Sequence, residues 1–198
     1  MNMMRFTTMK TKLRKYPSIF LILLLAISSC FLTGCVNQHP KDSKKSSQGE
    51  SVETMLEITD PKEKQAVLNA KAKVKALSGN PRIVATSPAV ADICDKLDLD
   101  LVGVPKSSVS KIPSRYKKVK KVGLAMSPDM EIVSSLNPDW ILAPSSLETD
   151  LKPKFEELKN TEYAFLNLRS VQGMYRSAQE LGEIFGKQQE AEKMTKEF

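Results

Sequence analysis

Residues 82–104 read RIVATSPAVADICDKLDLDLVGV, and this stretch decides the fold. It opens with a short apolar run at 83–85, continues with helically spaced apolar residues over 88–97, and closes with a second apolar run at 101–104. Two short apolar runs separated by one helix are typical of a strand–helix–strand unit with parallel strands. The stretch therefore predicts an α/β protein.

The same alternation continues toward the C-terminus. The expected strands are 119–122, 140–143 and 163–166, and the expected helices are 129–136 and 148–159. Such alternation predicts a parallel sheet with helices packed on its faces, here one α/β lobe over 81–170. Ligands of these sheets bind beyond the carboxyl ends of the strands. We therefore expect residues 86–87, the loop 105–116 and residues 123–127 to share one rim.

The C-terminal segment carries a further helical pattern. From about Val171 it contains Met174, Ala178, Leu181 and Ile184, and we expect one helix over 171–198. A helix of about 25 residues or more is long for a domain of this size. We interpret it as the start of a connecting helix that leads to a second lobe.

The N-terminal segment has the three parts of a secretory signal. A basic stretch ends at Lys15, an apolar run follows over 19–27, and the segment closes with Leu32-Thr33-Gly34-Cys35. The apolar run is shorter than the ~20 residues of a membrane span. The closing tetrapeptide resembles the lipobox of bacterial lipoproteins, which implies cleavage of a leader over 1–34 and lipidation of Cys35. An uncleaved anchor helix is the alternative, and either reading places the domain outside the cytoplasmic membrane.

Between this leader and the lobe lie two further segments. Residues 35–51 are polar and predict a lipidated flexible tether, and 52–80 predict a helical lead-in broken near Asp60-Pro61. The chain has one histidine, His39, and it falls in the tether, where a single imidazole is a poor metal site. Cys94 is the one cysteine beyond Cys35, so no internal disulfide is expected, and its spacing favours a buried helix position.

The net charge of +7 belongs mainly to the leader, which holds five of the 30 Lys and Arg and no Asp or Glu. The remaining 25 basic residues stand against 23 acidic ones, and this near balance disfavours nucleic acid as a partner.

The folded part carries no G-x-S-x-G elbow, P-loop, G-x-G-x-x-G motif or histidine base, which disfavours a secreted α/β enzyme. Carboxylate acid–base chemistry alone stays open as a route to an enzyme, and the absence of internal repeats disfavours a structural role.

Several stretches resemble one family. They are RIVAT at 82–86, KLDLDLVG at 96–103, IPSRY at 112–116, VGLAMSPDME at 122–131, LNPDWIL at 136–142 and MYRS at 174–177. Together they are similar to the N-terminal lobe of two-lobed, substrate-binding lipoproteins of ABC importers, and within these to the IsdE-like haem-binding members. The resemblance implies a monomeric, non-catalytic receptor that binds haem as its transported ligand and delivers it to an ABC permease. The same fold also serves ferric siderophores and cobalamin, which remain the alternative ligands, whereas a zinc or manganese site would need His and carboxylate ligands.

The resemblance also assigns residues. Met126 matches the axial Met that this lobe gives to the haem iron, with a His of the second lobe on the opposite side; an ordinary loop-packing Met is the competing interpretation. Glu131 matches the acidic residue that meets Arg on the permease, and it also suits the first turn of a helix. The expected contacts to the haem propionates come from a helix start and a neighbouring loop: Thr86, Ser87, Ala89, Val90, Lys106, Ser107 and Ser108. The loop departs from the family in offering Ser or Val where a Tyr is known.

Overall fold

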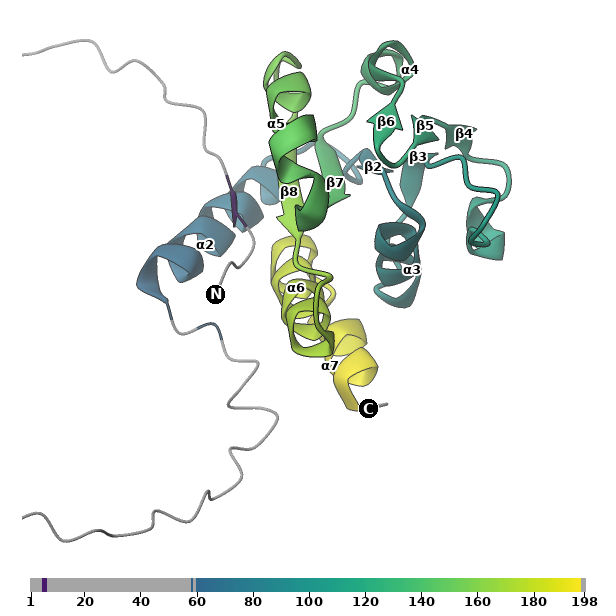
Figure 1. Ribbon diagram of the computed structural model, residues 1–198. Helices are drawn as coiled ribbons and strands as arrows, with labels where there is room; N and C mark the ends of the chain where they lie inside the picture. Colours follow the sequence, from purple (N-terminus) through teal and green to yellow (C-terminus); the bar gives the residue numbers. More distant parts are fainter. Residues whose placement is uncertain (1–4, 7–57, 59, 197–198) are drawn as a thin grey trace, which may run out of the picture. The chain divides into compact units, whose positions relative to one another are not determined.

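The computed structural model describes residues 5–6, 58 and 60–196 of the chain. At its centre is a sheet with the strand order β1-β8-β7-β2-β3-β4 (Figure 1). The strands are β1 (Arg5–Phe6), β2 (Ile83–Ala85), β3 (Leu101–Val104), β4 (Lys120–Lys121), β7 (Trp140–Pro144) and β8 (Glu162–Leu166). All of them run parallel except β1, which pairs antiparallel with β8. The predicted parallel α/β sheet is confirmed.

The described part includes only two residues of the predicted leader, those of β1. The cleavage that the sequence predicts would remove this strand and its pairing with β8. The rest of the leader, the tether with Cys35, and residues 52–57 lie outside the described residues. The buried residues of the described part all lie between Glu63 and Met194, so a chain that begins at residue 36 keeps every one of them.

Helices cover both faces of the sheet. They are α2 (Pro61–Lys75), α3 (Pro88–Lys96), α4 (Met130–Ser135), α5 (Glu148–Glu156), α6 (Val171–Phe185) and α7 (Gln188–Lys196), with 3₁₀ turns η1 (Ser114–Tyr116) and η2 (Ser145–Leu147). In Figure 1, α4 and α5 lie on the upper side, and α3, α6 and α7 lie on the lower side. Because both faces are covered, the central strands are apolar at successive residues.

The two apolar cores follow the period of the strands. In β2, Ile83 and Ala85 point into the core under α2, α3, α6 and α7, whereas Val84 points into the core under α4 and α5. Cys94 of α3 is fully buried in the first core, as its spacing predicts. Burial raises the pKa of this thiol to about 12, so it stays protonated and behaves as a small apolar residue.

The C-terminal helix differs from the prediction. The structure breaks it into α6 and α7, because Gly186 follows α6 in the left-handed conformation with φ of 71°. Its N–H donates to the carbonyl of Gly182, which is a common way for a helix to end. The prediction of one continuous helix over 171–198 is therefore wrong, since it overlooked a glycine suited to this conformation. No helix within 60–196 is both long and apolar enough to cross a membrane.

Candidate functional site at the carboxyl ends of the strands

The order of the strands defines where a ligand can enter. From β2 the chain crosses to β3 and β4 on one side, and β7 and β8 lie on the other side. The point where the order reverses is the gap between the carboxyl ends of β2 and β7, and sheets of this kind bind ligands there. The segments that follow the strands line this rim, as the sequence predicts for residues 86–87.

Thr86 follows β2 directly and is fully buried. Its amide donates to the carbonyl of Leu142 at 3.0 Å, and its hydroxyl donates to the same oxygen at 3.3 Å. The residue therefore joins the ends of β2 and β7 at the switch point. Both of its donors are used within the sheet and its side chain is fully buried, so Thr86 holds the strand ends together and presents no exposed group at the rim.

Ser87 is the N-cap of α3. Its hydroxyl accepts a hydrogen bond from the Val90 amide at 3.3 Å, and its carbonyl accepts one from Ala91. The Val90 amide is thus already bonded, which corrects the expectation that it is available to an anion. Ala89 is exposed in the same first turn.

The loop after β3 carries the predicted Lys and Ser contacts. The Lys106 amide donates to the carbonyl of Gly123 at 2.6 Å, and this bond ties the loop to the segment that holds Met126. The Ser107 hydroxyl accepts from the Ser110 amide at 3.0 Å and closes a turn. The side chains of Lys106 and Ser108 are exposed beside that turn.

Met126 lies in a hairpin that the sequence does not predict. The strands β5 (Gly123–Leu124) and β6 (Ser127–Pro128) pair antiparallel, and Ala125 and Met126 form the turn between them. Gly123 opens the hairpin with φ of 96°, and a Cβ there would lie 2.9 Å from the Asp129 nitrogen. The Met126 side chain is 74% exposed, so its sulfur is accessible to an external ligand.

Glu131 stands in the first turn of α4, next to this hairpin in the sequence. Asp129 caps the helix by accepting from the amides of Glu131 and Ile132 at 3.1 and 3.0 Å. The cap fixes the backbone of Glu131 and leaves its side chain exposed. No ion pair within 60–196 involves this carboxylate.

Two further segments reach the same rim, and the sequence analysis missed both. Ser145 and Ser146 follow β7 on the far side of the switch point, and Arg169 follows β8 with an exposed side chain. Both segments follow the carboxyl end of a strand, and their place on the rim can be recognised only once the strand order is known. The rim thus combines hydroxyls, basic side chains and an accessible thioether, and the described residues hold no group of three His, Cys, Asp or Glu that could bind a metal ion.

Comparison with known proteins agrees with this arrangement. Residues 83–198 match the model of the periplasmic binding protein family. The high-affinity heme uptake system protein IsdE of Staphylococcus aureus is 36% identical over 117 residues, which cover 59% of this chain and 39% of that protein. The chain therefore spans about two fifths of the length of this curated relative.

Solved structures extend the comparison. A substrate-binding protein of an ABC transporter from Listeria monocytogenes is 44% identical with a TM-score of 0.58, over 60% of this chain and 45% of that one. IsdE complexed with heme is 34% identical with a TM-score of 0.57 over the same shares. The petrobactin-binding protein YclQ of Bacillus subtilis is 25% identical with a TM-score of 0.52, over 60% of this chain and 43% of that one.

Proposed function

The chain belongs to the periplasmic binding protein family, and we propose that it captures haem outside the cell and delivers it to an ABC importer. The family consists of binding proteins, so this chain is not an enzyme, as the sequence predicts.

The observation that carries the haem assignment is the exposed thioether of Met126. A Met held in solvent at the turn of a hairpin has little packing to stabilise it, whereas a soft, neutral sulfur is a suitable axial ligand for haem iron. The similarity to IsdE, a heme uptake protein, supports the same ligand. The opposite face of the iron would take a His from a second lobe.

The haem propionates would meet the hydroxyl and basic groups of the rim. Lys106, Ser107 and Ser108 stand on the loop that is bonded to the hairpin through Gly123, and the helix start with Ser87 and Ala89 lies at the end of β2. Anions are favoured at a helix N-terminus by its partial positive charge. Thr86 is fully buried and would contribute only by joining the ends of β2 and β7, and the Val90 amide would contribute only the helix dipole.

Lipidation of Cys35 would hold the protein at the outer face of the cytoplasmic membrane. Acyl chains on this residue anchor a protein firmly, since each buried methylene adds to the affinity for the bilayer. The domain would act there as a monomer. Glu131 is exposed on α4, next to the Met126 hairpin in the sequence, and its carboxylate would form an ion pair with a basic residue of the permease.

A ferric siderophore is the second candidate ligand. The basic groups of the rim, Lys106 and Arg169 among them, would suit an anionic siderophore, and the similarity to the petrobactin-binding protein points the same way. The two candidate ligands differ in whether they need the thioether of Met126, because a siderophore already fills the coordination sites of its iron.

A haemin titration of Met126→Leu decides between them. Leucine keeps the size of the side chain and removes the sulfur, and Leu124→Ala is the matched control, since Leu124 is 59% exposed on the same hairpin. We expect wild type and the Leu124 variant to give the same Soret band, and the Met126 variant to lose or shift it. An unchanged band in Met126→Leu would reject the ligand role, and a ferric siderophore that binds all three proteins equally would favour the second candidate.

A further inference from the structure

The basic side chains of this domain are concentrated in one segment. Of the 25 Lys and Arg from residue 35 onward, seven lie within residues 101–128, which contain no Asp or Glu. The other 18 stand against all 23 acidic residues. The small net charge therefore conceals a separation along the sequence between a basic segment and an acidic remainder, and an uneven charge distribution can orient a molecule at a charged surface.

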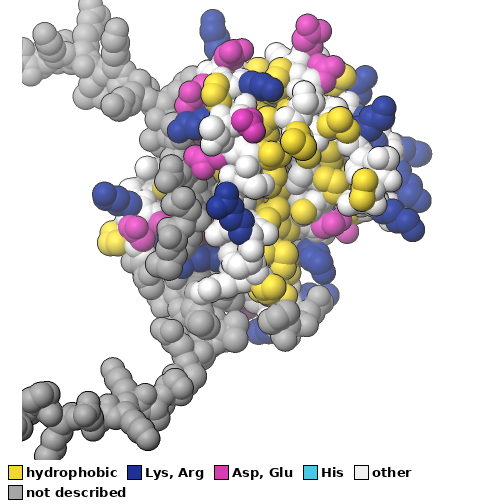
Figure 2. Space-filling view, viewed as in Figure 1, with side chains coloured by type: hydrophobic (Ala, Val, Ile, Leu, Met, Phe, Trp, Pro, Cys, Tyr) yellow, Lys and Arg dark blue, Asp and Glu magenta, His cyan; other side chains and the backbone are white. Residues whose placement is uncertain are grey.

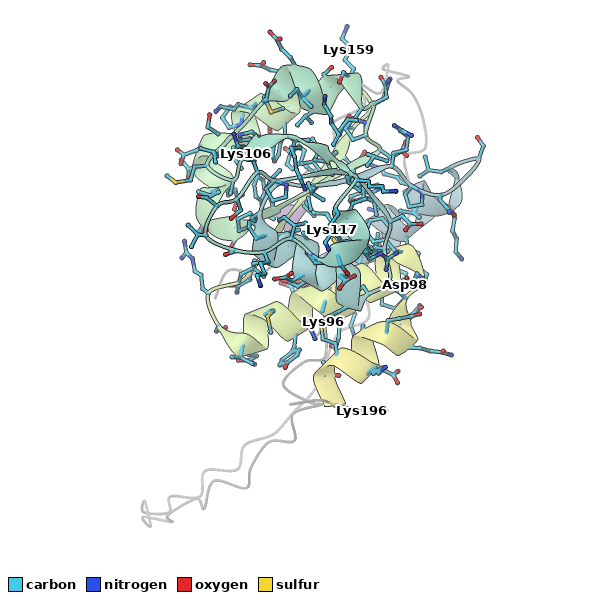
Figure 3. All side chains as sticks on the ribbon, turned by 90° about the vertical axis from the view of Figure 1, so that its right-hand side faces the viewer. Lys96, Asp98, Lys106, Lys117, Lys159 and Lys196 are labelled. Carbon is cyan, nitrogen blue, oxygen red and sulfur yellow. The ribbon has the colours of Figure 1, made fainter. Side chains whose placement is uncertain are left out.

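The structure places these side chains at one edge of the sheet. Lys120 and Lys121 form the edge strand β4, and Lys117 and Lys118 follow η1 just before it. Figure 2 shows Lys and Arg gathered along the right-hand edge of the molecule, and Figure 3, which turns that edge toward the viewer, places Lys106 and Lys117 on it. The lysine face is defined by six exposed side chains: Lys106, Lys111, Lys117, Lys118, Lys120 and Lys121.

The chemistry of this face suits a diffuse array of anions. The one arginine within residues 101–128, Arg115, is already held by Asp98 at 2.7 Å and by Asp100 at 2.8 Å. Among the described residues, no acidic side chain forms an ion pair with the six lysines. Lysine ammonium groups act as point charges. Unlike the planar guanidinium of arginine, they attract phosphates without requiring a partner of one particular geometry.

One apolar side chain stands within this face. Val109 is 95% exposed, and it lies between Lys106 and Lys111 in the loop that the Ser107–Ser110 hydrogen bond closes. An apolar residue flanked by basic ones is typical of surfaces that bind at the membrane interface, where the apolar group enters and the ammonium groups stay at the headgroups. An apolar side chain among lysines therefore favours a lipid surface as the partner.

We propose that the lysine face binds the anionic phosphate headgroups of membrane lipids. The domain would then lie on the bilayer with β4 and residues 109–118 against it, an orientation that rests on the proposed lipid anchor, although the binding itself does not. Lys106, which the proposed haem site also uses, would lie at the margin of this contact. Lysines near an anionic surface add their contributions, and the attraction falls off within a Debye length of about 10 Å at moderate salt.

The test uses residues 36–198, which keep every buried residue and carry no acyl chain. Their binding to vesicles of phosphatidylcholine, with and without phosphatidylglycerol, is measured by co-sedimentation at low and high salt. The variant Lys117→Gln, Lys118→Gln, Lys120→Gln removes three charges from the lysine face. Its matched control, Lys75→Gln, Lys159→Gln, Lys193→Gln, removes three exposed charges from α2, from the turn after α5, and from α7.

We expect binding only to the vesicles that contain phosphatidylglycerol, and loss of that binding at high salt. The lysine-face variant should bind at least about tenfold more weakly than wild type, and the control variant should bind within about twofold of it. Val109→Ser should weaken binding as well. Equal loss in the two triple variants, or binding to polyglutamate but not to the vesicles, would overturn the proposal, and none of these results depends on haem.

Discussion

Arg176 of α6 donates to the carboxylate of Glu63 on α2 at 3.0 Å, and the two side chains are only 11% and 7% exposed. Glu180, one turn further along α6, is buried beside them with neither carboxylate oxygen bonded to any described residue. Burial, and then the neighbouring Glu63 carboxylate, raise the pKa of Glu180 to about 9. One arginine thus faces two buried carboxyl groups, and the second stays protonated at neutral pH.

The raised pKa predicts how stability depends on pH. The unfolded chain releases this proton near pH 4.5 and the native state keeps it until about pH 9, so folding takes up a proton between these values. The contribution of Glu180 to stability is therefore full below pH 4.5 and falls as pH rises toward 9, by at most about 1.4 kcal/mol per pH unit. Glu180→Gln should remove this slope, so its stability relative to wild type should rise between pH 5 and pH 8.

Urea unfolding at the two pH values measures the effect. Glu157→Gln is the control, because Glu157 is exposed and should change the pH dependence little. A Glu180 variant that keeps the slope of wild type would contradict the assignment of a buried, protonated carboxyl at this position.

Cys94 should be inert in the native protein. It is fully buried, and burial raises the pKa of its thiol to about 12, so the reactive thiolate is scarce as well as inaccessible. In residues 36–198, where it is the single thiol, a disulfide reagent at pH 8 should label it only as fast as the domain opens. Ser108→Cys adds an exposed thiol as an internal standard, and rapid labelling of both groups would show that α3 is not packed as described.

Gly186→Ala distinguishes two helices from one. Within a continuous helix, alanine would stabilise the protein by about 1 kcal/mol relative to glycine. At a left-handed position it should destabilise by about 1 kcal/mol, since no atom lies within 4 Å of the added Cβ and the cost is that of the backbone conformation alone. Gly186→Asn should cost less, and Gly79→Ala, with open space and no positive φ, is the control in the same thermal unfolding experiment.

Some parts of the fold and of the candidate site can be predicted from the sequence, and others cannot. Strands such as 83–85 and 140–143 are predictable because both of their faces are buried and they stand out as apolar runs. The hairpin of Met126 is not, because its strands are two residues each and include the polar Ser127. The Val90 amide could be recognised as bonded only from the cap geometry of Ser87, and Ser145 joins the rim only through the strand order, which no local pattern contains.

Glu131→Lys should separate ligand binding from delivery. The side chain is exposed on α4, and its reversal costs at most about 1 kcal/mol through the helix dipole. We expect haem affinity to stay within about twofold of wild type and uptake by cells to fall at least about tenfold, because a charge pair with the permease would become a repulsion. Glu157→Lys, an equal reversal at the end of α5, should leave uptake unchanged, and normal uptake in the Glu131 variant would reject docking.

Gly123→Ala tests whether the hairpin positions Met126. With φ of 96° and a Cβ 2.9 Å from the Asp129 nitrogen, the alanine variant must move backbone atoms, at a cost of about 1–3 kcal/mol. The β5–β6 pairing would then shift. We expect circular dichroism to report a folded domain and the haemin spectrum to resemble that of Met126→Leu, because the sulfur is present but displaced. If Gly123→Ala bound haemin as wild type does, the conformation of the hairpin would not matter for haem binding, and its role in positioning Met126 would be rejected.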